Sequence, residues 1–142
     1  MRNGVLEFTV VDPDPDYLGV EIRAQSDRFA ATTFIFAGHG QLTELADLIA
    51  GTPASVPDQR RYELGSPDPH WAGGYCTLLL KTSDRAGHLV LEVHLADDDQ
   101  RSSGGQATFN FPVEAAAIDA FVQGLRAMDA ARSGYATLGP AA

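Results

Sequence analysis

The stretch Tyr75–Leu95 reads YCTLLLKTSDRAGHLVLEVHL and contains two apolar runs separated by a polar turn. Within each run every second residue is apolar, which is the period-two pattern of a strand with one buried face. The linking residues Ser83–Ala86 form a short polar segment, so they predict a hairpin that pairs the two strands antiparallel. We expect this hairpin to lie within a mainly antiparallel sheet.

The sequence on either side contains more segments of the same kind. Alternating or β-rich patterns predict strands over residues 5–11, 18–24, 29–36 and 106–111, and residues 60–64 could add a short one. Leu42, Leu45 and Ile49 recur at helical spacing and predict an amphipathic helix over 41–50. A second helix is expected to begin at Pro112, a residue well suited to the first helical position, and to end near Gly134.

These elements predict an α+β fold with the order βββ-α-βββ(β)-α. We expect one mainly antiparallel sheet of six or seven strands, with the two amphipathic helices packed on one of its faces. Residues 1–134 are expected to form a single domain, because the length and the apolar content of 44% suit one ordinary core. Residues 135–142 are expected to be a frayed C-terminal tail.

Composition limits the class of partner. The formal net charge is −9, which argues against nucleic-acid binding and permits a basic protein partner. The single cysteine, Cys76, fits a reducing compartment, and no run of apolar residues is long enough to cross a bilayer. The start of the chain runs directly into a strand pattern, so we expect no signal peptide and a cytoplasmic protein.

No pattern of residues predicts a catalytic group, a cofactor or a metal site. His88 and His94 lie six residues apart on one strand, about 20 Å, which is too far to share one metal ion. Cys76 falls on the apolar face of its strand, where a thiol is not activated as a nucleophile. A metal site would need His39 or His70 to approach from loops.

Two loops contain candidate partner-binding residues. Asp97, Asp98 and Asp99 form an acidic loop that lacks the ligand spacing of a calcium site. Trp71 stands in a loop rich in Pro and Gly, where it either caps the core or anchors a partner.

The strand pattern also predicts a polar face on the sheet, opposite the helices. We expect this mixed-charge, Thr-rich face to carry Glu7, Thr9, Glu21, Arg23, Thr77, Lys81, Glu92, His94, Thr108 and Asn110. Such a face is either a solvated surface stabilised by cross-strand pairs or a flat recognition platform.

Three segments of the chain carry a resemblance: the helix Leu42–Ile49, the strand Gly87–Val93 and the ending Ala120–Arg126. With the βββ-α-βββ-α layout, they resemble immunity proteins of contact-dependent and polymorphic toxin systems. The similarity is to the WapI-type immunity group and related actinobacterial domains of unknown function. None of the three segments is a site motif, so no functional residue is carried over.

The resemblance implies a non-enzymatic protein that binds and blocks a toxin domain. On this hypothesis the partner-binding residues are Trp71, Glu92, His94, Asp97, Asp98 and Asp99. Two alternatives stay open: a small-molecule or metal-binding domain with a cleft near His39, His70 and His94, and a homodimer that pairs through an edge strand or the open sheet face.

Overall fold

A computed structural model describes residues 4–68, 73–97 and 104–139. The order of elements is β1 (Val5–Asp12), β2 (Leu18–Gln25), β3 (Ala30–Ala37), α1 (Gln41–Ile49), β4 (Gln59–Gly65), β5 (Tyr75–Thr82), β6 (Leu89–Ala96), β7 (Gln106–Val113), α2 (Ala115–Ala131) and β8 (Tyr135–Leu138). The fold is therefore α+β with two helices, as expected, and residues 60–64 belong to a strand, β4.

The strands form two antiparallel sheets of four strands each, not the expected single sheet of six or seven. The first sheet has the order β3-β2-β1-β8 and the second has the order β4-β5-β6-β7. Period-two alternation shows which residues share a face of a strand, but it carries no information about which distant strands pair. The chain leaves the first sheet through α1 and begins the second sheet at β4, so consecutive strands stay hairpin-linked within each sheet.

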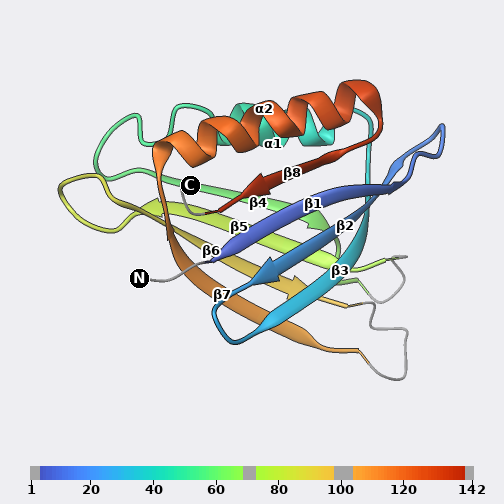
Figure 1. Cartoon of the computed structure of the whole chain (residues 1–142), viewed down its shortest axis with the longest axis horizontal. Coiled ribbons are helices and arrows are strands. Elements are labelled where there is room, and N and C mark those ends of the chain that lie inside the picture. Colours follow the sequence, from blue (N-terminus) through green and yellow to red (C-terminus); the bar gives the residue numbers. More distant parts are fainter. Residues whose placement is uncertain (1–3, 69–72, 98–103, 140–142) are drawn as a thin grey trace.

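The core lies between the two sheets and beneath the helices. Figure 1 shows α1 and α2 side by side along one edge of the sheets, with β8 lying next to α2. The rings of Phe8 in β1 and Phe121 in α2 meet edge to face at a centroid distance of 5.4 Å, and both are fully buried. The two sheets and the two helices share one core. The expectation that both helices pack on one face of a single sheet is therefore wrong.

The two helices are joined by a polar contact as well as by apolar packing. The Asp129 carboxylate of α2 accepts hydrogen bonds from the backbone N–H and the hydroxyl of Thr43 in α1, at 3.0 and 2.7 Å. Arg126 and Asp47 form an exposed ion pair across the same two helices. Within the described residues, neither helix is long and apolar enough to span a membrane.

The C-terminal residues 135–138, expected to lie in a frayed tail, instead form β8. This strand pairs antiparallel with β1, and its Ala136 and Leu138 side chains are buried. Gly124 of α2 lies against Ala136 so closely that an added Cβ would be 2.8 Å from the Ala136 Cβ. Residues 135–138 are held because β8 packs against both α2 and β1 and buries two apolar side chains there.

The second helix begins later than expected. Pro112 belongs to β7, opposite Val90 of β6, and the helix starts at Ala115 with Glu114 as an extended N-cap residue. Phe109, Phe111 and Val113 continue the buried alternation of the strand past the proline. Proline is tolerated there because β7 is an edge strand.

Candidate binding surface

The outer face of the second sheet carries two of the residues that the sequence predicts for partner binding. Glu92 and His94 lie two positions apart on β6 and alternate with the buried Val93, so both point away from the core. In the strand register, Glu92 lies between Leu79 and Asn110.

His94 is oriented by its cross-strand neighbours. It lies between Thr77 and Thr108 in the register, and its Nδ1 is 2.9 Å from the Thr108 hydroxyl. The Tyr75 ring approaches the imidazole edge to face, with ring centroids 6.5 Å apart. These contacts hold the ring in one orientation on a half-buried part of the sheet face.

Apolar side chains occupy the middle of this outer face. Leu79 of β5 and Val90 of β6 point outward and are half-buried, because they are out of phase with the core residues of their strands. Lys81 lies opposite Val90, and Arg61 lies opposite Leu79. The face therefore combines an apolar centre with charged neighbours of both signs, where the sequence pattern had indicated mainly threonines and charges.

A pocket of about 420 Å³ opens at one end of this face. Its lining residues come from the ends of β5, β6 and β7 and from the adjoining loops: Ser66, Pro67, Tyr75, His94, Ala96, Asp97, Gly104, Gly105 and Gln106. The backbone N–H of Asp97 donates to the carbonyl of Gly105 at 2.9 Å and closes the base of the loop between β6 and β7. His94 and Asp97 thus belong to one pocket, whereas Glu92 lies outside it.

The remaining predicted partner-binding residues, Trp71, Asp98 and Asp99, lie outside the described residues. The structure therefore brings together His94 and Asp97 around the pocket and places Glu92 beside His94 on the sheet face.

The other histidines do not share a cleft with His94 in the part of the chain that the structure describes. His39 stands next to the start of α1, where its Nε2 is 3.0 Å from the carbonyl oxygen of Pro15. His88 precedes β6, and its Nδ1 is 2.6 Å from the Asp84 carboxylate, which lowers the pKa of Asp84 below its usual value. His70 lies outside the described residues. The cleft expected near His39, His70 and His94 therefore lacks His39, because that residue does not line the His94 pocket.

Cys76 does not face this surface. Cys76 is fully buried in the core, and burial raises the pKa of its thiol well above the usual range. Among the residues that the structure describes, no group of three or more His, Cys, Asp or Glu side chains is arranged to hold a metal ion.

The polar face expected from the sequence is divided between the two sheets. Thr77, Lys81, Glu92, His94, Thr108 and Asn110 lie on the outer face of the second sheet, whereas Glu7, Thr9, Glu21 and Arg23 belong to β1 and β2 of the first. Each half is outward-facing, so the alternation predicted the orientation of these side chains correctly but not their common surface.

Sequence reasoning missed an aromatic cluster on the first sheet. The Phe36 ring meets both Tyr17 and Phe34 edge to face, at centroid distances of 4.8 and 4.9 Å. Phe34 and Phe36 alternate with the buried Ile35 along β3, so they point to the outer face. This alternation is the sequence signal that could have predicted the outward-facing aromatic pair. Phe29, at the hairpin between β2 and β3, is 72% exposed.

Comparisons with known proteins add no relative to this description. No protein-family description, curated protein or solved structure matches the chain.

Proposed function

We propose that this chain is a non-enzymatic protein-binding module that acts like an immunity protein and blocks a toxin domain. The proposal rests mainly on the outer face of the second sheet. Leu79 and Val90 form an apolar centre there, and Lys81, Glu92 and His94 surround it. Protein interfaces have this composition, with an apolar centre and a polar, partly charged rim.

The charge of the chain supports the same proposal. A net charge of −9 favours a basic partner, because long-range attraction raises the rate at which oppositely charged proteins meet. Toxin domains that act on nucleic acid must themselves attract phosphate groups, and such a basic surface is complementary to an acidic binding protein.

The proposal is tested by co-expressing the chain with toxin domains, beginning with any that a gene beside its own encodes. We expect protected growth and a stable complex in gel filtration. Failure of both protection and complex formation would show that the proposal is wrong.

Two matched variants test whether the partner binds the outer face of the second sheet. Glu92→Lys reverses a charge on its outer face, and Glu21→Lys makes the same change on the outer face of the first sheet. We expect Glu92→Lys to weaken the complex roughly tenfold, whereas Glu21→Lys leaves the dissociation constant nearly unchanged. Equal effects of the two variants would contradict the assignment of the surface.

The pocket of about 420 Å³ beside His94 favours a second candidate function, the binding of a small molecule. Tyr75 and His94 supply an aromatic and a polar contact at its wall. A metabolite screen by thermal unfolding distinguishes this function: a ligand that stabilises the wild type and fails to stabilise Tyr75→Ala would favour it over protein binding.

A further inference from the structure

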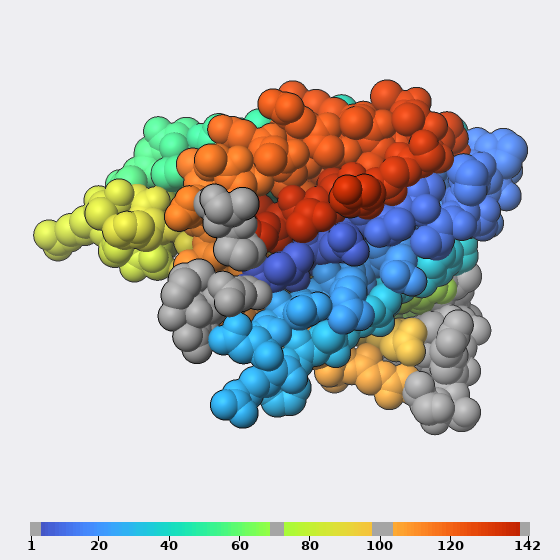
Figure 2. Space-filling model, in the orientation of Figure 1, coloured from blue at the N-terminus to red at the C-terminus, as the bar shows by residue number. Residues whose placement is uncertain are grey.

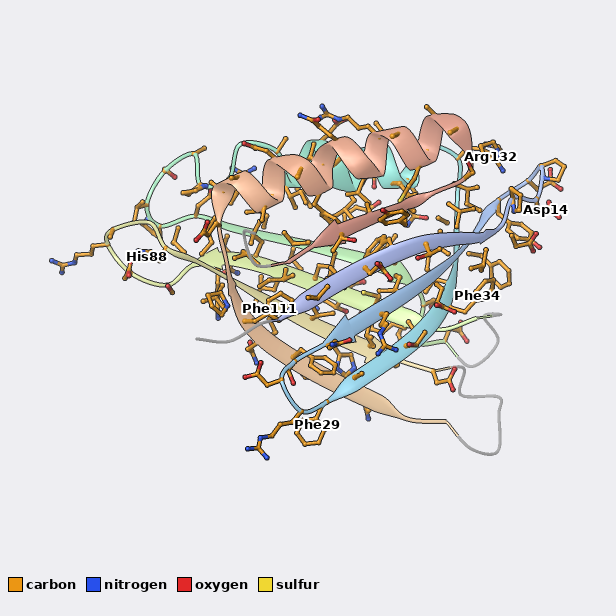
Figure 3. All side chains as sticks on the ribbon, in the orientation of Figure 1. Asp14, Phe29, Phe34, His88, Phe111 and Arg132 are labelled. Carbon is orange, nitrogen blue, oxygen red and sulfur yellow. The ribbon has the colours of Figure 1, made fainter. Side chains whose placement is uncertain are left out.

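A second groove adjoins the His94 pocket and lies between the start of β3 and the ends of β6 and β7; the two share Ala96, Asp97, Gly105 and Gln106. Its volume is about 360 Å³, and its lining residues are Ala30, Ala31, Thr32, Leu95, Ala96, Asp97, Gly105, Gln106 and Ala107. The β2–β3 hairpin, which forms one wall, projects from the lower edge of the molecule in Figure 2. Figure 3 shows the Phe29 side chain pointing outward from the tip of this hairpin.

The edge of β3 directs the backbone groups of alternate residues away from β2 and toward this groove. Hydrogen-bonded and non-bonded pairs alternate along antiparallel strands, and the backbone N–H of Ser26 donates to the carbonyl of Phe29. The even-numbered residues of β3 therefore direct their N–H and C=O groups away from β2. Phe34 follows this rule, because its carbonyl accepts a hydrogen bond of 2.6 Å from the N–H of Gly74.

Two residues at the start of the same edge have no such partner among the residues that the structure describes. Ala30 and Thr32 line the groove, and no hydrogen bond to their backbone groups is present within residues 4–68, 73–97 and 104–139. An edge of this kind is a template on which another extended chain can add. Gly74 already pairs with Phe34 at the far end of this edge, so the part of the edge that has no partner among the described residues lies at Ala30 and Thr32.

The opposite wall leaves room for a backbone to approach. Its residues include Ala96, Gly105 and Ala107, and an added Cβ at Gly105 would meet no atom within 4 Å. The Thr33 hydroxyl donates to the carbonyl of Ala96 at 2.7 Å and ties β3 to the end of β6 next to the groove. Adjacent strands need a spacing of about 4.8 Å, which small side chains permit.

We propose that this groove binds an extended segment of a cationic protein partner, which adds as a strand to the free edge of β3 at Ala30 and Thr32. The inference rests on the proposed function in that the partner is a protein. In this mode of recognition, main-chain hydrogen bonds supply the affinity and side chains beside the strand supply the selectivity.

Three observations select this occupant. The outward N–H and C=O groups of Ala30 and Thr32, which have no partner among the described residues, are matched by another extended backbone. The net charge of −9 favours a positively charged segment over an acidic one or a second copy of the same chain. Phe29 adjoins Ala30 and is 72% exposed, so it offers an apolar contact at the end of the groove.

The probe for the experiment is a synthetic peptide, selected on the purified wild-type protein from a display library of random peptides of about ten residues. We expect peptides enriched in Lys, Arg and β-branched residues. Thr32→Pro removes the N–H that points away from β2, whereas Thr32→Ala keeps this N–H and removes only the hydroxyl and the γ-methyl group. Thr32→Pro should weaken peptide binding roughly tenfold or more, and Thr32→Ala should change it little.

A second variant covers the case in which Thr32→Pro does not fold. Ala107→Leu keeps every backbone N–H and fills the groove from its β7 side, so it should also weaken peptide binding. Unchanged binding by Ala107→Leu or by folded Thr32→Pro would overturn the proposal. So would the absence of any selected peptide, or wild-type self-association that Thr32→Pro abolishes, because the occupant would then be a second copy.

Failure of strand addition can be distinguished from failure of the proposed function. If wild type and Thr32→Pro protect cells equally from a toxin that the wild type blocks, toxin blocking stands and strand addition is wrong. If peptides require the Thr32 N–H but the chain protects against no toxin, strand addition stands and toxin blocking is wrong.

Discussion

Single polar side chains determine how the segment between α1 and β4 is held. The Asp58 carboxylate accepts hydrogen bonds from the Arg60 guanidinium at 3.0 and 2.9 Å and from the N–H of Ala54 at 2.8 Å. Arg60 also donates to the carbonyl of Leu48 at the end of α1. The sequence pattern does not predict these contacts, because nothing in it indicates that Asp58 pairs with Arg60 or that Arg60 reaches the end of α1.

The Asp58 contacts make the stability of the protein depend on pH. The hydrogen bond from Arg60 holds the pKa of Asp58 below its usual value. A depressed pKa contributes stability above the unfolded value of about 4, and that stability is lost as the pH falls through the folded value. We therefore expect Asp58→Asn to lower the melting temperature by a few degrees at pH 7, with the difference shrinking in acid.

Thermal unfolding followed by circular dichroism from pH 7 to pH 3 checks this expectation. Asp16→Asn is the control, because Asp16 is an exposed carboxylate on the loop between β1 and β2. A melting difference for Asp58→Asn that stays constant with pH would contradict the role of its charge.

At the scale of elements, close contact between α2 and β8 depends on a glycine. Glycine inside a helix is unfavourable by about 1 kcal/mol relative to alanine, so Gly124 would be a poor choice on propensity alone. Its position opposite Ala136 explains its presence, since a Cβ there would be 2.8 Å from the Ala136 Cβ and 3.2 Å from its Cα. The close approach lets β8 cover the side of β1 beneath the helix.

Replacement of this glycine is expected to separate the two elements. Gly124→Ala should lower the free energy of unfolding by about 1 kcal/mol or more despite the better helix propensity, because the strand must shift. Amide hydrogen exchange should become faster in residues 135–138 before the rest of the sheet is affected. Gly38→Ala is the matched control, because an added Cβ there is 3.9 Å from its nearest neighbour, Gln41. Greater stability of Gly124→Ala would refute the packing argument.

Over the whole molecule, the two sheets depend on the C-terminal strand to complete their shared core. β8 is the outer strand of the first sheet and lies against α2, so it connects the end of the chain to β1 near its start. Ala136 and Leu138 are both buried at this junction. Each buried leucine contributes about 2 kcal/mol, and the paired backbone of β8 adds to this amount.

Removal of residues 135–142 is therefore expected to lower the melting temperature by roughly 10 °C or more. The truncated chain exposes the edge of β1, so it should also aggregate more readily on heating. Removal of residues 140–142 alone leaves β8 intact and is the control. Equal melting temperatures for the two truncated chains would mean that β8 contributes little.

The sequence by itself determined the α+β class, the hairpin of β5 and β6, the first helix and the outward direction of Glu92 and His94. These features depend on local periodicity and on short turns, which neighbouring residues specify. Only the tertiary structure decided that the strands divide into two sheets, that Pro112 stays in a strand, and that residues 135–138 form β8. The tertiary structure also decided that His94 and Asp97 line one pocket and that β3 is an edge strand. Pairing between distant strands is set by burial in a shared core, which alternation along one strand does not encode.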